Sequence, residues 1–204
     1  MTTRTYDIVI WGATGFTGRL VMAYMAKTYG VDGEIKWAVA GRNAVKLAEV
    51  KREVLGAEAE KLPEVIADSN DEASLRALVS CTKVVCTTVG PYALYGSTLV
   101  ALCAELGTHY CDLTGEVQWM RQMIETHQSA AEGSGAKIVH TCGFDSIPSD
   151  LGTYFVQREM HKAHGVYAPQ VKYRVVGSSG GVSGGTVASM MNMMEEASVN
   201  PEIL

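Results

Sequence analysis

The stretch Tyr6-Asp-Ile-Val-Ile-Trp-Gly-Ala-Thr-Gly-Phe-Thr-Gly18 decides the fold of this 204-residue chain. Its apolar beginning predicts a strand that ends at Trp11, and an amphipathic helix pattern follows the glycines. A glycine turn between strand and helix lets the backbone approach a pyrophosphate, and the helix N-terminus offers free N–H groups. The motif therefore predicts a dinucleotide site made of Gly12, Thr14, Gly15, Phe16, Thr17 and Gly18. A tight turn that binds no ligand is the alternative interpretation.

Apolar runs alternate with helix patterns along residues 7–141, which predicts a parallel sheet with helices on both faces. The expected strands are Asp7–Trp11, Ile35–Ala40, Glu64–Ala67, Val84–Thr88, His109–Asp112 and Lys137–Thr141. The expected helices between them cover about 17–29, 44–55, 71–80, 95–106 and 117–132. Right-handed crossovers give the strand order 3-2-1-4-5-6. The prediction is a Rossmann-type, doubly wound α/β domain over residues 1–145.

The pattern changes after Cys142. Residues 146–204 predict a helix at Ser146–His161, a strand at Lys172–Val176 of an antiparallel sheet, and a helix at Thr186–Ala197. One strand and two helices make a poor independent domain. We therefore expect residues 146–204 to be the truncated beginning of a second α+β domain; pairing with another subunit is the alternative.

The composition excludes several classes of protein. The net charge of −5 and the absence of Lys/Arg clusters argue against a nucleic-acid partner. The five cysteines lie mostly in apolar runs without ligand spacing, which predicts buried thiols, a reducing cytoplasmic location and no metal site. We also expect neither a signal peptide nor a transmembrane segment, because no basic-then-apolar leader and no apolar run of about 18 residues is found.

The end of the second strand predicts the cofactor. An NAD enzyme usually has an acidic residue there for the ribose 2′-OH, about twenty residues after the glycines. Here Ala40-Gly-Arg42 occupies that place, with Lys46 one helical turn later. Since the planar guanidinium of Arg42 can bind a 2′-phosphate, the sequence favours NADP over NAD. A solvated turn residue is the alternative role for Arg42.

Three further segments lie at the same edge of the sheet. Val89, Gly90 and Pro91 follow the fourth strand and are expected beside the nicotinamide, with Tyr92 as a hydrogen-bond donor to substrate or as a wall of the pocket. Asp112 ends the fifth strand and Glu116 follows it, and either carboxylate is a candidate catalytic group or a helix cap. Gly143 and Phe144 follow the sixth strand and are expected to contact the nicotinamide.

The last predicted helix has two features of its own. Ser183-Gly-Gly-Thr186 opens it and would suit an anionic group, or forms a mobile loop. Met190, Met191, Met193 and Met194 cover a broad side of the helix. Such residues fill an irregular core, or form an adaptable wall for an apolar substrate or a lipid surface.

The motifs together resemble the saccharopine dehydrogenase-like oxidoreductases, in the branch that includes the trans-acting enoyl reductases. The segments that carry the resemblance are Gly12–Gly18, Ala40–Arg42, Val89–Gly96, Tyr110–Glu116 and Gly143–Asp150. The resemblance implies a pyridine nucleotide cofactor and a second domain for substrate and dimerisation, in proteins about twice this length. It implies a homodimer when the protein is complete, and it identifies no proton donor.

We therefore predict an NADP-dependent oxidoreductase that transfers a hydride to or from a small-molecule or lipid-type substrate. A short-chain dehydrogenase is disfavoured, since none of the nine tyrosines is followed four residues later by lysine. The candidate catalytic residues are Tyr92 and Asp112. The alternative from another class is a non-enzymatic NADP-binding sensor or scaffold.

Overall fold

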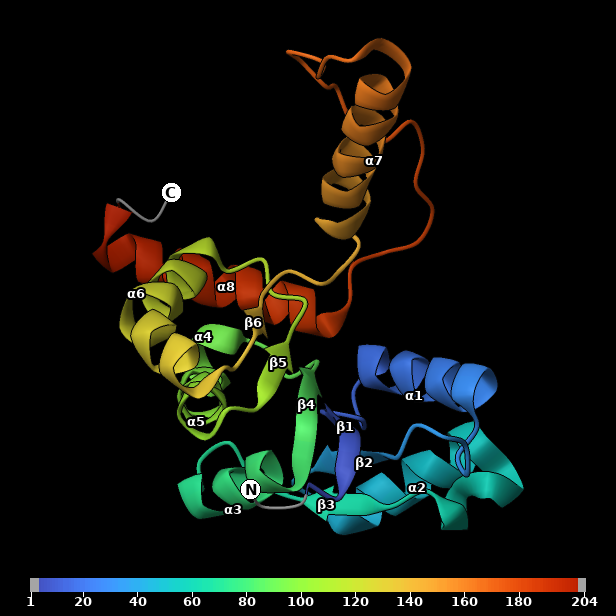
Figure 1. Cartoon of the computed structure of the whole chain (residues 1–204). Coiled ribbons are helices and arrows are strands. Elements are labelled where there is room, and N and C mark those ends of the chain that lie inside the picture. The colour runs from blue at the N-terminus through green and yellow to red at the C-terminus, as the bar shows by residue number, and fades with distance from the viewer. Residues whose placement is uncertain (1–3, 202–204) are drawn as a thin grey trace.

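A six-stranded parallel sheet forms the centre of the computed structural model, which describes residues 4–201 (Figure 1). The predicted order is confirmed: β3-β2-β1-β4-β5-β6. The register pairs Ile8 with Trp37 on one side and with Val84 on the other, and every neighbouring pair is parallel. The strands are β1 (Tyr6–Trp11), β2 (Trp37–Gly41), β3 (Glu64–Ile66), β4 (Thr82–Thr87), β5 (His109–Cys111) and β6 (Ile138–Val139).

Helices connect the strands and continue the chain after β6. They are α1 (Phe16–Tyr29), α2 (Ala44–Leu55), the 3-10 helix η1 (Gly56–Lys61), α3 (Glu72–Cys81), α4 (Tyr92–Tyr95), α5 (Ser97–Leu106), α6 (Val117–Ser134), α7 (Ile147–His164) and α8 (Gly184–Val199). Side-chain caps fix three of their starts, because Asn43 accepts a hydrogen bond from the Lys46 N–H, Asp71 from the Ala73 N–H and Ser183 from the Thr186 N–H.

The core has two parts, one on each face of the sheet. Val9 belongs to the cluster that α3, α5 and α6 cover, whereas its neighbour Ile10 belongs to the cluster under α1 and α2. Both side chains are fully buried, as expected for a strand in the middle of a parallel sheet. Burying an aliphatic side chain of this size stabilises the fold by roughly 1.5–3 kcal/mol. The packing on both faces therefore fixes the positions of the carboxyl ends of the strands.

The chain after β6 differs from the prediction in one element. No strand forms at Lys172–Val176, and this segment is mostly exposed. The alternating pattern is compatible with a strand, but the ladder needs a hydrogen-bonding partner, and residues 4–201 supply none there. Helix α7 buries none of its residues and extends away from the sheet (Figure 1). Helix α8 returns to lie across α6, where Gln118 Nε2 donates to Glu196 Oε2 at 3.1 Å.

The cysteines are all free, and their burial differs from the prediction. Cys103 is buried, which raises the pKa of its thiol, but Cys142 is exposed because it lies in the segment that leads from the edge strand to α7. Within residues 4–201, no helix is long and apolar enough to span a bilayer. No group of three acidic, histidine or cysteine side chains in this part of the chain is placed to hold a metal ion.

Candidate functional site

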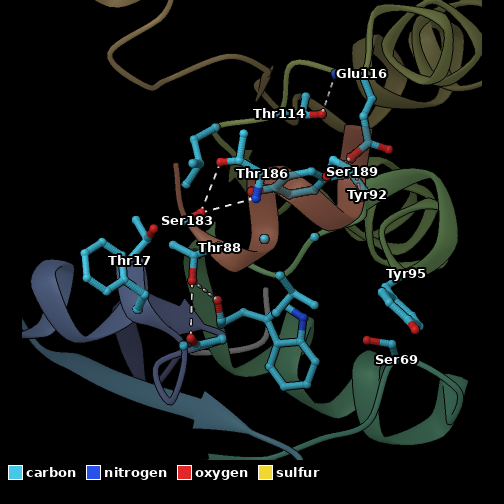
Figure 2. A pocket seen from close by; sticks show the side chains of 18 of the residues that line it. Thr17, Ser69, Thr88, Tyr92, Tyr95, Thr114, Glu116, Ser183, Thr186 and Ser189 are labelled. Carbon is cyan, nitrogen blue, oxygen red and sulfur yellow. Dashed lines mark hydrogen bonds between the residues drawn. The ribbon is translucent and has the colours of Figure 1, made fainter. Parts of the chain in front are cut away.

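A cavity of about 640 Å³ lies at the carboxyl ends of the strands (Figure 2). Its walls come from the turns that follow β1, β2, β3, β4 and β5, from Asp145, and from the segment 183–193 at the start of α8. Ligands of open α/β sheets bind at this edge, at the point where the strand order reverses. The cavity is thus in the place that the sequence predicted for a dinucleotide.

Each glycine of the first turn has a different physical role. Gly12 has φ +91°, and a Cβ there would lie 2.6 Å from Val89 Cγ2. A Cβ on Gly18 would lie 2.2 Å from the Gly12 carbonyl oxygen, so this glycine allows α1 to pack on the turn. Gly15 begins α1 without a side-chain cap, and the first turn of the helix has no acidic residue. The turn therefore leaves space and N–H groups for a pyrophosphate, and Thr14, Phe16 and Thr17 also line it.

Arg42 lines one end of the cavity, and its role as the ligand of the adenosine 2′-phosphate stays a prediction. Lys46 does not line the cavity, and its backbone N–H instead contributes to the cap of α2. Asp68, Ser69 and Asn70 also line this end and are not among the predicted site residues. Their position directly after the third strand was the signal that could have identified them.

The turn after β4 forms the opposite end. Val89, Gly90 and Tyr92 line it, whereas Pro91 does not. The Tyr92 hydroxyl donates to the Thr87 carbonyl at 3.3 Å, and its ring lies 5.7 Å from that of Trp119. Burial raises the pKa of Tyr92, which keeps its hydroxyl protonated. These contacts favour the wall interpretation of Tyr92.

Asp112 lies behind the cavity and is 2% exposed. Its carboxylate accepts hydrogen bonds from the Tyr110 hydroxyl at 2.8 Å and from the N–H groups of Thr114 and Thr141. His140 Nδ1 lies 2.7 Å from the same carboxylate. Protein groups therefore occupy both oxygens, and Asp112 joins the ends of β5 and β6. A direct role in catalysis stays a prediction that this geometry does not favour.

The segment after β6 is placed differently from the prediction. Gly143 and Phe144 are not among the lining residues, and Phe144 is 71% exposed. A Cβ on Gly143 would lie 3.1 Å from Leu113 Cβ, so Gly143 packs on the loop that follows β5. Asp145 lines the cavity in their place.

Glu116 connects two walls of the cavity. Its carboxylate is buried and accepts hydrogen bonds of 2.8 Å from the N–H groups of Tyr92 and Ala93. It accepts a third, also of 2.8 Å, from Ser189 Oγ of α8, and the two side chains lie beside each other in Figure 2. The sequence had offered a helix cap as its structural role. The carboxylate does cap a helix, but the helix is α4, which lies 23–24 residues earlier in the chain.

Helix α8 supplies the remaining wall. Thr186, Ser189, Met190 and Met193 line the cavity, and Ser183 accepts a hydrogen bond from the Thr186 N–H at 3.2 Å. Met191 and Met194 point elsewhere and are exposed. The methionine side of the helix is thus divided between the cavity and the surface.

Comparisons with known proteins agree with this geometry. The sequence model of the family described as saccharopine dehydrogenase NADP binding domain matches residues 8–139. The chain belongs to this family. Residues 8–139 are accordingly an NADP-binding domain, and the glycine turn and Arg42 fit that cofactor because they offer a pyrophosphate cradle and a 2′-phosphate ligand.

Among curated relatives, the trans-acting enoyl reductases of Mycobacterium tuberculosis and Mycobacterium leprae are 42% and 40% identical over 200 and 202 residues. These matches cover 98% of this chain and 47% of each relative. The chain therefore spans about half the length of these relatives. The solved saccharopine dehydrogenase (L-Glu forming) from Saccharomyces cerevisiae has a TM-score of 0.61 at 17% identity, over 78% of this chain and 32% of that one, and shows the same fold.

Proposed function

We propose that this chain is the cofactor-binding part of an NADP-dependent oxidoreductase that acts on an enoyl-type substrate. The observation that carries the proposal is the cavity, which extends from Arg42 past the glycine turn to Gly90 and α8. The names of the curated relatives support the reaction class. Formation of a homodimer and a cytoplasmic location stay predictions from the sequence.

The residues of the cavity have the tasks of binding and orientation. The nicotinamide, when bound, supplies or accepts the hydride. The N–H groups at the start of α1 would hold the pyrophosphate, and Arg42 would hold the 2′-phosphate. Gly90 leaves room beside Tyr92 and Ser189, because a Cβ there would lie 3.4–3.5 Å from both side chains. Met190 and Met193 add apolar surface at this end, which suits an acyl group.

The proposal is tested by titrating NADPH and NADH into the wild type and Arg42→Ala. Loss of charge-assisted hydrogen bonds worth about 1.5–3 kcal/mol should weaken NADPH binding by roughly 10–100-fold and leave NADH nearly unchanged. Lys46→Ala is the matched control, since it removes a nearby cation outside the cavity. Equal losses for both cofactors would contradict the assignment of Arg42.

Binding of NADPH without its oxidation by enoyl thioesters in the complete protein would favour the sensor alternative.

A further inference from the structure

Glu116 is a buried carboxylate at the end of the cavity opposite Arg42. It is 3% exposed and lines the cavity. Each of its three partners donates to it: Oε1 accepts from Tyr92 N and Ser189 Oγ, and Oε2 accepts from Ala93 N. The three contacts come from two backbone N–H groups and one hydroxyl, and none of these donors is a charged group.

The charge of Glu116 is not neutralised by a cation. In the part of the chain that the structure describes, Glu116 takes part in no ion pair. Arg42 lies after β2, on the far side of the glycine turn, and the other charged lining residues, Asp68 and Asp145, are acidic. This end of the cavity therefore carries a negative charge that is shielded from water.

Such a charge distinguishes the two forms of the cofactor. The nicotinamide ring is neutral in NADPH and carries one positive charge in NADP⁺. Its place at the β4 and β5 end follows from the strand order and from Arg42 at the adenosine end. With an effective dielectric constant of about 20, a unit charge within about 12 Å of the ring favours the charged form by tenfold or more.

We propose that Glu116 makes the nicotinamide end of this cavity favour the oxidised, positively charged ring, and so strengthens hydride donation by the bound cofactor. The inference rests on the proposed function, because it requires that NADP(H) binds in this cavity. It goes further in giving a defined electrostatic task to one carboxylate, besides the hydrogen bonds by which that carboxylate holds α4 and α8.

The test measures the dissociation constants of NADP⁺ and NADPH for the full chain by calorimetry, without any substrate. In Glu116→Gln, which keeps the shape and removes the charge, NADP⁺ should weaken about tenfold or more relative to NADPH. A tenfold change in this ratio is about 30 mV in the two-electron potential of the bound cofactor. An unchanged ratio would overturn the inference and leave the proposed function intact, whereas a wild type that binds neither cofactor would overturn the proposed function.

Two control variants separate charge from packing. Ser189→Ala removes one hydrogen bond and keeps the carboxylate, so both affinities should change together and their ratio should stay within about twofold. Asp145→Asn removes an exposed carboxylate of the same cavity. Because solvent screens an exposed charge, this variant should change the ratio of the NADP⁺ and NADPH dissociation constants by about threefold or less. A ratio that changes as much in Ser189→Ala as in Glu116→Gln would overturn the electrostatic explanation.

The wild type provides a second measurement that does not depend on the folding of a variant. Because the negative charge of Glu116 would attract the positively charged ring of NADP⁺ and not the neutral ring of NADPH, the wild type should bind NADP⁺ at least as tightly as NADPH. A tenfold preference of the wild type for NADPH would overturn the inference. Circular dichroism of each variant checks that the measured affinities belong to folded protein.

Discussion

Gly18→Ala should destabilise the fold, because the new Cβ would clash with backbone atoms and with no side chain. The new Cβ would lie 2.2 Å from the Gly12 carbonyl oxygen and 2.8 Å from Ala13 Cα, and real Cβ contacts are essentially never closer than 3.0 Å. Since no flexible side chain can rotate away, α1 must move as a unit away from the turn. Overpacking of this kind costs about 1–3 kcal/mol, and the rigid neighbours favour the upper half of that range. For a chain of this length the midpoint of thermal unfolding should fall by roughly 4–12 °C.

Gly15→Ala is the matched control in the same turn. Its Cβ would meet the Gly12 carbonyl at 3.4 Å, which is an ordinary contact, and φ is −78°. The free energy of unfolding should change by no more than about 0.5 kcal/mol, while NADPH binding weakens because Gly15 lines the cavity. Urea denaturation followed by circular dichroism measures both variants. If Gly18→Ala is as stable as the wild type, or if Gly15→Ala is destabilised as much as Gly18→Ala, the packing role assigned to Gly18 is refuted.

Two further predictions concern charges at the sheet. Lys51→Met should lower the free energy of unfolding by about 1–3 kcal/mol, because Lys51 Nζ is buried and donates to the Leu62 carbonyl at 2.5 Å and to Glu64 at 2.7 Å. Adding Glu64→Gln removes the charge left without its partner and should restore part of that loss. A double variant that is no more stable than Lys51→Met in urea denaturation would contradict the prediction. The ammonium of Lys83 lowers the pKa of Asp7 from its usual value, so the stabilisation that this ion pair provides is present at neutral pH and is lost as the pH falls through the pKa of Asp7 in the folded protein. Asp7→Asn should therefore be less stable than the wild type at pH 7, and melting curves should converge in acid.

The sheet could be predicted because its signals are local. The pattern of apolar runs and the glycine turn fix which residues form β1 and α1, and the crossover rule then orders the strands. The same reasoning places Arg42 at the edge of the sheet, since it follows β2 directly. Asp68, Ser69 and Asn70 follow the third strand in the same way, so the same rule would have placed them at this edge.

Contacts between distant segments could not be predicted. Glu116 and Ser189 are 73 residues apart, and no periodicity in either segment indicates that α8 lies over the turn after β4. Asp112 shows a second limit. Its position after β5 places it at the ligand-binding edge, but the direction of its side chain depends on Tyr110 and His140, which turn the carboxylate into the protein. A sequence pattern gives the position of a residue more readily than the direction of its side chain.

The charges of the proposed cofactor site also give the bound molecule a direction. NADP⁺ carries a phosphate on its adenosine ribose and a positive ring at its other end. The cavity has Arg42 beside β2 and the buried carboxylate of Glu116 beside β5. In the reverse orientation, the 2′-phosphate would meet Glu116 and the positive ring would meet Arg42, and like charges placed together disfavour that arrangement. Hence Arg42, which would bind the 2′-phosphate, and Glu116, which would attract the charged ring, would together select the orientation that places the nicotinamide beside α8.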